Sequence, residues 1–149
     1  MSRLRTLILW RQAERQVACT ALAMLPLAAL GVRWLGLRRT QALLAGPSRP
    51  RSDGADGLAR AQAFARIVTA AARHGPYRAR CLPIALTLQS ILRRHGIESA
   101  LRFGVRRGPR GIEAHAWVEH SGVALASPAE VEAFSPFEAV DAPDRAPAP

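Results

Sequence analysis

Lysine is absent from this sequence, and all 21 basic residues are Arg, against 11 acidic residues. Aromatic residues make up only 5% of the chain, and no helix-turn-helix or zinc-finger pattern occurs. A basic chain can bind nucleic acid, but base recognition needs clustered cations and stacking side chains, whereas these Arg residues are scattered. We therefore expect no nucleic-acid partner.

Cysteine is scarce as well. Cys19 and Cys81 lie far apart, form no CxxC pair, and no two His residues stand at metal-ligand spacing. The sequence contains no Gly-rich phosphate loop, no internal repeat and no transit signature. We therefore expect no metal and no cofactor, and a cytoplasmic location, because nothing favours an oxidising compartment. Cys19 falls in an Ala- and Leu-rich run and is predicted to lie in the core.

The chain also lacks an apolar run of the length that a membrane span needs. Its longest uncharged stretch, 17–32, has 16 residues and contains Pro26, whereas a spanning helix takes about 20 apolar residues. A signal peptide fits poorly, because the apolar run begins late and lacks a small-residue exit. We predict two buried or interface helices broken near Pro26, and membrane association through 17–32 is the alternative.

Four segments follow from composition. Residues 1–45 read as an N-terminal helical region and 46–57 (GPSRPRSDGADG) as a loop. Residues 58–140 form the predicted core, which begins with an Ala-rich amphipathic helix, and the Pro-rich tail 141–149 is predicted to be disordered. Residues 1–110 contain 20 Arg and four acids, but the remainder contains one Arg and seven acids. Such an uneven charge would steer an acidic peptide or a partner protein.

The segment 80–119 (RCLPIALTLQSILRRHGIESALRFGVRRGPRGIEAHAWVE) organises the rest of the chain. It begins with a predicted helix that opens on Cys81, has Pro83 in its first turn and stops at Gly96. This helix is apolar nearly all round, which predicts burial. A cysteine at a helix start faces unpaired N–H groups and the positive end of the dipole, which favour the thiolate.

Two alternating runs follow, separated by the turn signal GPRG. In the second run, His115 shares a face with Trp117 and two carboxylates, and points away from the more aliphatic face of its strand. Each residue alone has a plainer explanation, since a buried Cys serves as a small core residue and a strand His is often structural. Together, a buried helix opening on Cys and a strand carrying His are typical of thiol proteases and transglutaminases.

The C-L-P start of the helix, its L-R-R-H-G-I end, and the strands G-V-R-R and A-H-A-W-V-E resemble the lasso peptide biosynthesis B2 proteins. These are transglutaminase-like cysteine proteases that remove the leader from a lasso peptide precursor. The resemblance implies Cys81 as the nucleophile and His115 as the general base and then acid. It also implies a separate leader-binding protein and a cyclase as partners.

The third catalytic member departs from that family, which usually carries an Asp in a short strand after the His. An ungapped reading puts Ser127 at this position, and no carboxylate lies between Glu119 and Glu130. Ser127 also fits a helix N-cap, with Glu130 completing a capping box. Ser127 and Glu130 are therefore the open candidates, with Glu113 and Glu119 as alternatives on the face of His115.

The sequence thus predicts an α+β fold: a papain/transglutaminase-like core, with a buried Cys helix on a small antiparallel sheet, preceded by N-terminal helices. The predicted activity is leader removal from a lasso peptide precursor. Three alternatives stay open: an acyl transferase that uses the same Cys–His pair to form an amide, a non-catalytic peptide-binding scaffold, and a membrane-associated accessory protein.

Overall fold

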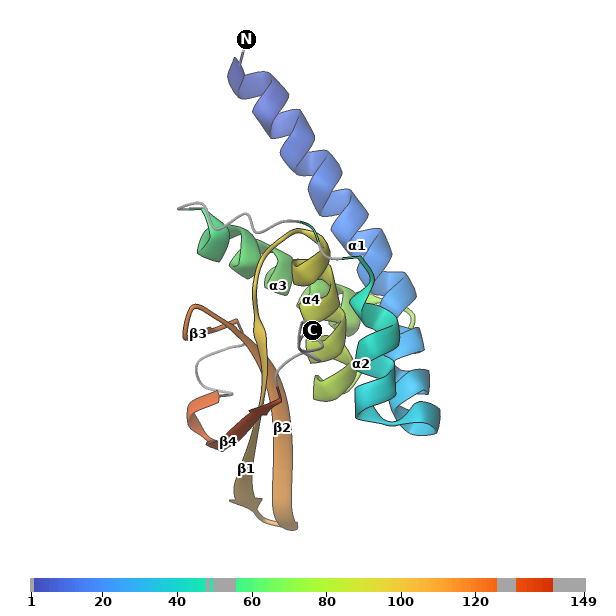
Figure 1. Cartoon of the computed structure of the whole chain (residues 1–149), viewed down its shortest axis with the longest axis vertical. Helices are drawn as coiled ribbons and strands as arrows, with labels where there is room; N and C mark the ends of the chain where they lie inside the picture. Colours follow the sequence, from blue (N-terminus) through green and yellow to red (C-terminus); the bar gives the residue numbers. More distant parts are fainter. Residues whose placement is uncertain (1, 48, 50–55, 126–130, 141–149) are drawn as a thin grey trace, which may run out of the picture.

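The computed structural model describes residues 2–47, 49, 56–125 and 131–140. This part of the chain forms helices followed by a curled antiparallel sheet, so the predicted α+β class with N-terminal helices is confirmed (Figure 1). The helices are α1 (Ser2–Leu35), α2 (Leu37–Ala45), α3 (Gly57–His74) and α4 (Cys81–Arg94). The strands are β1 (Ala100–Gly108), β2 (Gly111–His120), β3 (Val123–Ala124) and β4 (Ser135–Val140).

Helix α4 is the centre of the core. Nine of its 14 residues are buried, and α1, α2 and α3 all pack against it together with β2. The sequence prediction that this helix is buried on most sides is confirmed. It ends where predicted, since Gly96 has a φ of 72° that residues with a Cβ rarely adopt. The N–H of Ile97 closes the helix by donating to the Leu92 carbonyl at 2.9 Å.

The predicted break near Pro26 is wrong, because α1 continues through it as one helix of 34 residues. Pro26 is exposed, so water can bind the carbonyl that loses its helical hydrogen bond. The chain turns instead at Gly36, where φ is 77°, and α2 then folds back along α1 and α4.

Cys19 was also predicted wrongly, since it is exposed and not part of the core. The inner face of α1 is formed by five other residues, namely Val17, Ala21, Met24, Leu25 and Ala28. At 100° per residue, Cys19 falls outside this stripe.

Helix α2 docks on α4 through buried polar groups. The Gln41 amide donates to Gln89 Oε1 at 2.9 Å, and the Ser90 hydroxyl donates to the Leu44 carbonyl. Because both amide side chains are buried, this pairing fixes one seating of α2 on α4.

The sheet has the strand order β3-β2-β1-β4, and every neighbouring pair is antiparallel. The β1–β2 hairpin has the predicted alternation: Ala116 and Val118 join the core, while His115 lies on the opposite face. Strand β4 was not predicted. Its short sequence begins SPF, and Pro136 fits there because β4 lies at the edge of the sheet.

Several sequence predictions fall on residues that the structure does not describe. The helix N-cap predicted at Ser127, with Glu130 completing its capping box, lies outside the described residues. The tail 141–149 lies outside them as well.

Candidate active site

Cys81 is the first residue of α4 and is half-buried. Arg80, which precedes it, is extended and makes no side-chain capping hydrogen bond. The first helical bond runs from the Ile84 N–H to the Arg80 carbonyl at 3.2 Å. The earlier N–H groups of this turn have no partner within the helix, so they can donate to an oxygen placed beside Cys81.

His115 lies in the middle of β2 between two aromatic rings. Its ring centroid is 6.1 Å from that of Trp117 and 5.1 Å from that of Phe134, with interplanar angles of 24° and 28°. Its Nε2 atom is shielded from solvent and has no hydrogen-bond partner among the described residues. A buried nitrogen without a hydrogen-bond partner costs free energy, so a polar group of a ligand placed beside this atom would be stabilised.

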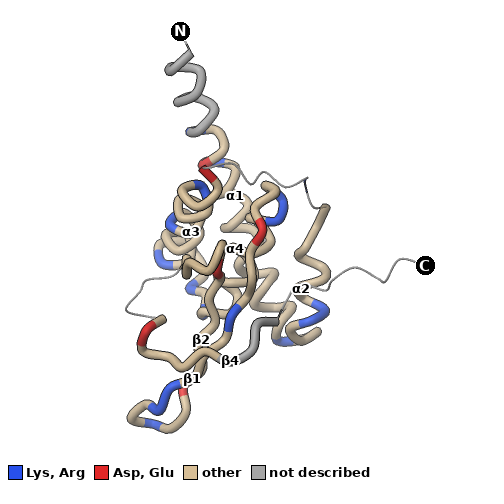
Figure 2. The backbone as a smooth tube through the Cα atoms, turned by 60° about the vertical axis from the view of Figure 1, so that its left-hand side comes forward, with Lys and Arg blue, Asp and Glu red and all other residues tan. Residues whose placement is uncertain are grey.

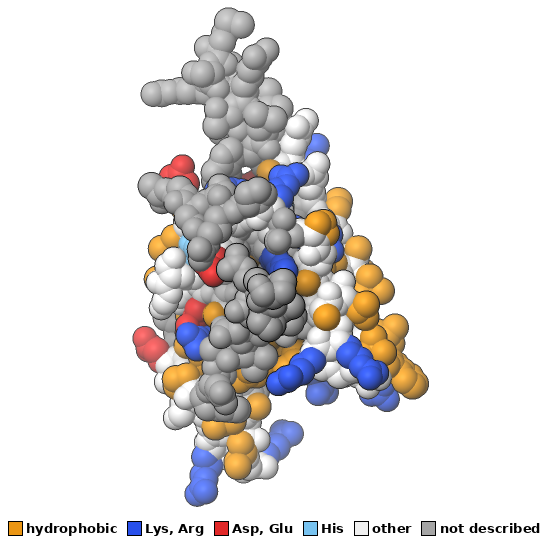
Figure 3. Space-filling model, viewed as in Figure 1, with side chains coloured by type: hydrophobic (Ala, Val, Ile, Leu, Met, Phe, Trp, Pro, Cys, Tyr) orange, Lys and Arg blue, Asp and Glu red, His pale blue; other side chains and the backbone are white. Residues whose placement is uncertain are grey.

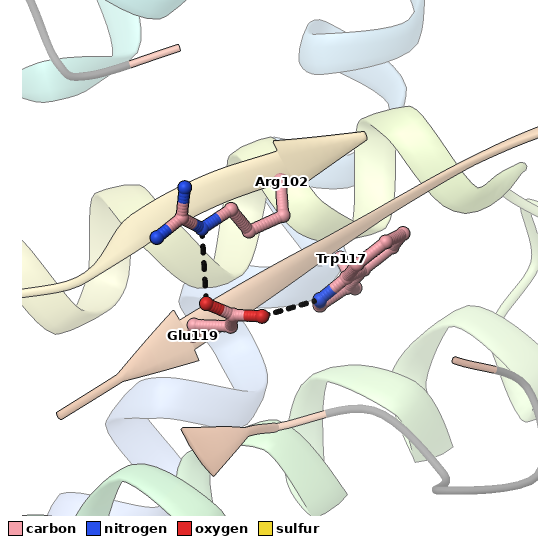
Figure 4. A network of polar contacts seen from close by, with 3 residues as sticks. All are labelled: Arg102, Trp117 and Glu119. Carbon is pink, nitrogen blue, oxygen red and sulfur yellow. Dashed lines mark hydrogen bonds and ion pairs between the residues drawn. The ribbon is translucent and has the colours of Figure 1, made fainter. Parts of the chain in front are cut away.

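Trp117 is itself held by a carboxylate (Figure 4). Its indole N–H donates to Glu119 Oε1 at 3.1 Å, and Arg102 Nε donates to Glu119 Oε2 at 2.9 Å. Glu119 therefore uses both oxygens to link β1 to the ring that stacks on His115. Because Trp117 is buried and Glu119 partly buried, these charge-assisted bonds are less screened than a surface pair.

Phe134 also contacts Arg106, whose guanidinium carbon lies over the ring, 4.6 Å from its centroid. Arg106 in turn donates from Nε to Glu113 Oε2 at 2.7 Å. This arrangement fixes the second ring of the His115 stack from β1. The sequence alone gave no signal for Phe134, because its partners lie about 20 or more positions earlier in the chain.

Helix α4 packs against β2, the strand that carries His115. Five residues join the end of α4 to β1, which runs back along the helix (Figure 1). On that hairpin, Gly104 of β1 pairs with His115 of β2.

The structure thus places the two predicted catalytic residues on elements that pack together, Cys81 at the start of α4 and His115 in β2. Among the described residues, no hydrogen bond joins the Cys81 thiol to the His115 imidazole. Strand alternation aims His115 toward the face with Trp117 and Glu119, away from Ala116 and Val118 in the core. Their role as a catalytic pair stays a prediction.

The four candidates for the third catalytic residue fall into two groups, those outside the described residues and those whose hydrogen-bond partners are seen. Ser127 and Glu130 lie outside the described residues. Glu113 is paired with Arg106, and Glu119 with Trp117 and Arg102. Among the described residues, neither of the last two forms a hydrogen bond with His115; Glu119 instead holds Trp117, whose ring stacks beside the imidazole.

Within the residues that the structure describes, no group of three or more His, Cys, Asp or Glu side chains is arranged to hold a metal ion.

A helix that opens on Cys and packs on an antiparallel sheet whose second strand carries His defines a papain/transglutaminase-like fold. The family described as the transglutaminase-like superfamily matches residues 21–139, which is most of the chain. The protein therefore belongs to the transglutaminase-like superfamily. Comparisons with curated proteins and with solved structures gave no match. Membership fits chemistry of the cysteine protease or acyl transferase type, in which a thiol attacks a carbonyl.

Proposed function

We propose that this protein is a cysteine protease that removes the leader peptide from a lasso peptide precursor. One observation carries the proposal: in a chain of this superfamily, a cysteine opens the buried helix that packs on the histidine-bearing strand. The resemblance of the segment 80–119 to the lasso peptide biosynthesis B2 proteins supplies the substrate.

In the proposed mechanism, His115 takes the proton of the Cys81 thiol. The thiolate attacks the carbonyl at the leader–core junction, and the N–H groups of the first α4 turn stabilise the oxyanion. The C–N bond then breaks, His115 protonates the departing amine of the core, and water hydrolyses the thioester that remains on Cys81.

In this proposal the two aromatic rings help to orient the imidazole, which is the role of the carboxylate in a catalytic triad. Trp117 and Phe134 restrict rotation of the imidazole, and Glu119 fixes Trp117. An orienting group improves a Cys–His pair, but the pair retains its chemistry where the imidazole is held by other means. The proposed partners are a separate leader-binding protein, which presents the precursor, and a cyclase, which uses the released core.

Cleavage followed by mass spectrometry tests this proposal. The full chain is mixed with the precursor and the leader-binding partner, in the wild-type form and as Cys81→Ala. Cys19→Ser is the matched control, because Cys19 is exposed on α1 and takes no part in the site. We expect the wild type and Cys19→Ser to release the leader as a peptide with a free C-terminal carboxylate, the product of hydrolysis. Cys81→Ala should release no leader.

Other outcomes would identify the alternatives. A product in which an added amine, instead of water, is joined to the leader would indicate an acyl transferase. Binding of the precursor without cleavage, equal in the wild type and Cys81→Ala, would indicate a non-catalytic scaffold and would refute the protease.

A further inference from the structure

Large apolar side chains project into solvent from α1 and α2. Leu27 is 58% exposed, Leu30 56%, Trp34 74% and Leu43 69%. We call these four residues the α1–α2 apolar face. Figure 3 shows hydrophobic side chains gathered over α1 and α2, with Arg side chains at their lower end.

The outward side of α1 differs from that of a typical surface helix, which is polar. Its exposed positions from Cys19 to Leu30 include Ala23, Pro26 and Leu27, and no charged residue occurs between Val17 and Val32. This stripe is about 20 Å long. A stripe of this length without polar residues needs a partner that removes it from water.

The helix cannot lie across a bilayer while the fold is intact. Residues Arg11–Leu35 are long and apolar enough for a span, with a mean hydropathy of 1.6. The inner face of α1, however, is buried against α3 and α4, with Val17 and Leu25 each 1% exposed. Lipid can therefore contact the outer face alone, which is the geometry of a helix lying in the plane of a membrane surface.

The charge around the α1–α2 apolar face distinguishes between two possible binding partners, a second copy of the chain and a membrane surface. Between residues 15 and 52 the sequence has six Arg and no Asp or Glu. Arg33, Arg38 and Arg39 are exposed and lie within five positions of Trp34, on either side of the junction of α1 and α2 at Gly36. Figure 2 shows basic residues in the region of α2. A second copy of the chain would bring these cations against their own kind. Anionic headgroups would pair with them, and Trp suits the boundary between headgroups and acyl chains.

We propose that the α1–α2 apolar face docks on the surface of a membrane that contains anionic lipids. Leu27, Leu30, Trp34 and Leu43 enter the boundary of the acyl region, and the three Arg residues bind lipid phosphates. This inference goes beyond the proposed protease and does not depend on Cys81. Its test therefore needs no catalytic activity.

Co-sedimentation of the full chain with vesicles tests the inference. The vesicles contain phosphatidylcholine with or without phosphatidylglycerol. We expect the wild type to bind the anionic vesicles, and Leu27→Gln combined with Leu30→Gln to weaken binding more than about tenfold. Arg38→Gln combined with Arg39→Gln should weaken it roughly thirtyfold, because each basic residue near an anionic surface contributes about 1 kcal/mol.

Ile112→Gln is the matched control, because Ile112 is 80% exposed but lies at the far end of the β1–β2 hairpin. Its binding should equal that of the wild type. Trp34 gives a second readout: its emission should shift to shorter wavelength with anionic vesicles, seen as the difference from Trp34→Gln.

Three outcomes would overturn the inference. The wild type could remain in the supernatant with anionic vesicles, or the control could lose as much binding as the apolar variant. The third is that the protein self-associates without vesicles and that the Leu27 and Leu30 substitutions abolish this self-association. In that case a second copy of the chain would cover the α1–α2 apolar face.

Discussion

Gly104 of β1 lies directly opposite His115 of β2, and the room left by its missing side chain is filled by the rings beside that histidine. A Cβ on Gly104 would lie 2.9 Å from two carbons of the Trp117 ring and 2.9 Å from Phe134 Cβ. Real Cβ atoms almost never make such contacts, so the His115 stack requires glycine here. Glycine is needed at this position because atoms of Trp117 and Phe134 approach the backbone closely, and not because the backbone has a conformation that only glycine adopts.

Gly104→Ala should therefore disturb the stack. We expect it to destabilise the fold by about 1–3 kcal/mol, the usual cost of overpacking, and to reduce leader release more than this loss explains. Urea unfolding and the cleavage assay measure the two effects. Gly57→Ala is the matched control, since its Cβ would meet His120 Nε2 at 3.4 Å, an ordinary contact. Equal effects of the two substitutions would contradict the packing argument.

Glu119→Gln should weaken the support of Trp117. The substitution keeps the shape but removes the charge that both Trp117 and Arg102 use, so we expect a loss of about 1–2 kcal/mol in unfolding free energy. Glu113→Gln makes a matched comparison, because Glu113 also joins β2 to an Arg of β1 but its side chain is 39% exposed, against 21% for Glu119. The Glu113→Gln variant should lose less than about 0.5 kcal/mol of unfolding free energy. If the two variants behave alike, Glu119 is only a surface ion pair.

His115→Phe should separate stability from activity. The phenyl ring can keep the stacking with Trp117 and Phe134 and removes the unpaired buried Nε2. We expect the variant to be as stable as the wild type, or more stable by about 1 kcal/mol, because the cost of that nitrogen disappears. Leader release should vanish. A variant that still cleaves would remove His115 from the mechanism.

His95 makes stability depend on pH. It follows α4, and its ring lies tilted against that of Phe64, with 4.8 Å between the ring centroids. Its pKa is lowered from the ordinary 6.5 by burial and then by the positive charges of Arg60 and Arg49. The unfolded chain therefore binds a proton at a higher pH than the folded chain does. The His95 contribution is fully present above pH 6.5 and is lost as the pH falls toward the lowered pKa.

Unfolding in urea at a series of pH values measures this contribution. The wild type should lose stability as the pH falls below 6.5 toward the lowered pKa of His95, and His95→Asn should lose less over the same range. An equal slope in both proteins would show that other groups cause the acid sensitivity.

The sequence by itself determined the elements whose signals are local. The apolar run from Cys81, its stop at Gly96 and the alternation of the hairpin each depend on the nearest few residues, because helices and strands repeat at fixed periods. For the same reason Cys81 at a helix start and the face of His115 could be predicted. The Pro26 prediction failed because the environment of a proline, here solvent, decides whether a helix continues.

Tertiary structure decided everything that depends on residues distant in the chain. Only the folded chain shows that β4 pairs with β1, that Phe134 stacks on His115 and that Gly104 makes room for the stack. Likewise, Cys19 and Leu27 lie in the same apolar run as Val17 and Leu25, yet the first two face solvent and the last two the core. Hydropathy gives the composition of that run, but which side is buried depends on where α3 and α4 pack.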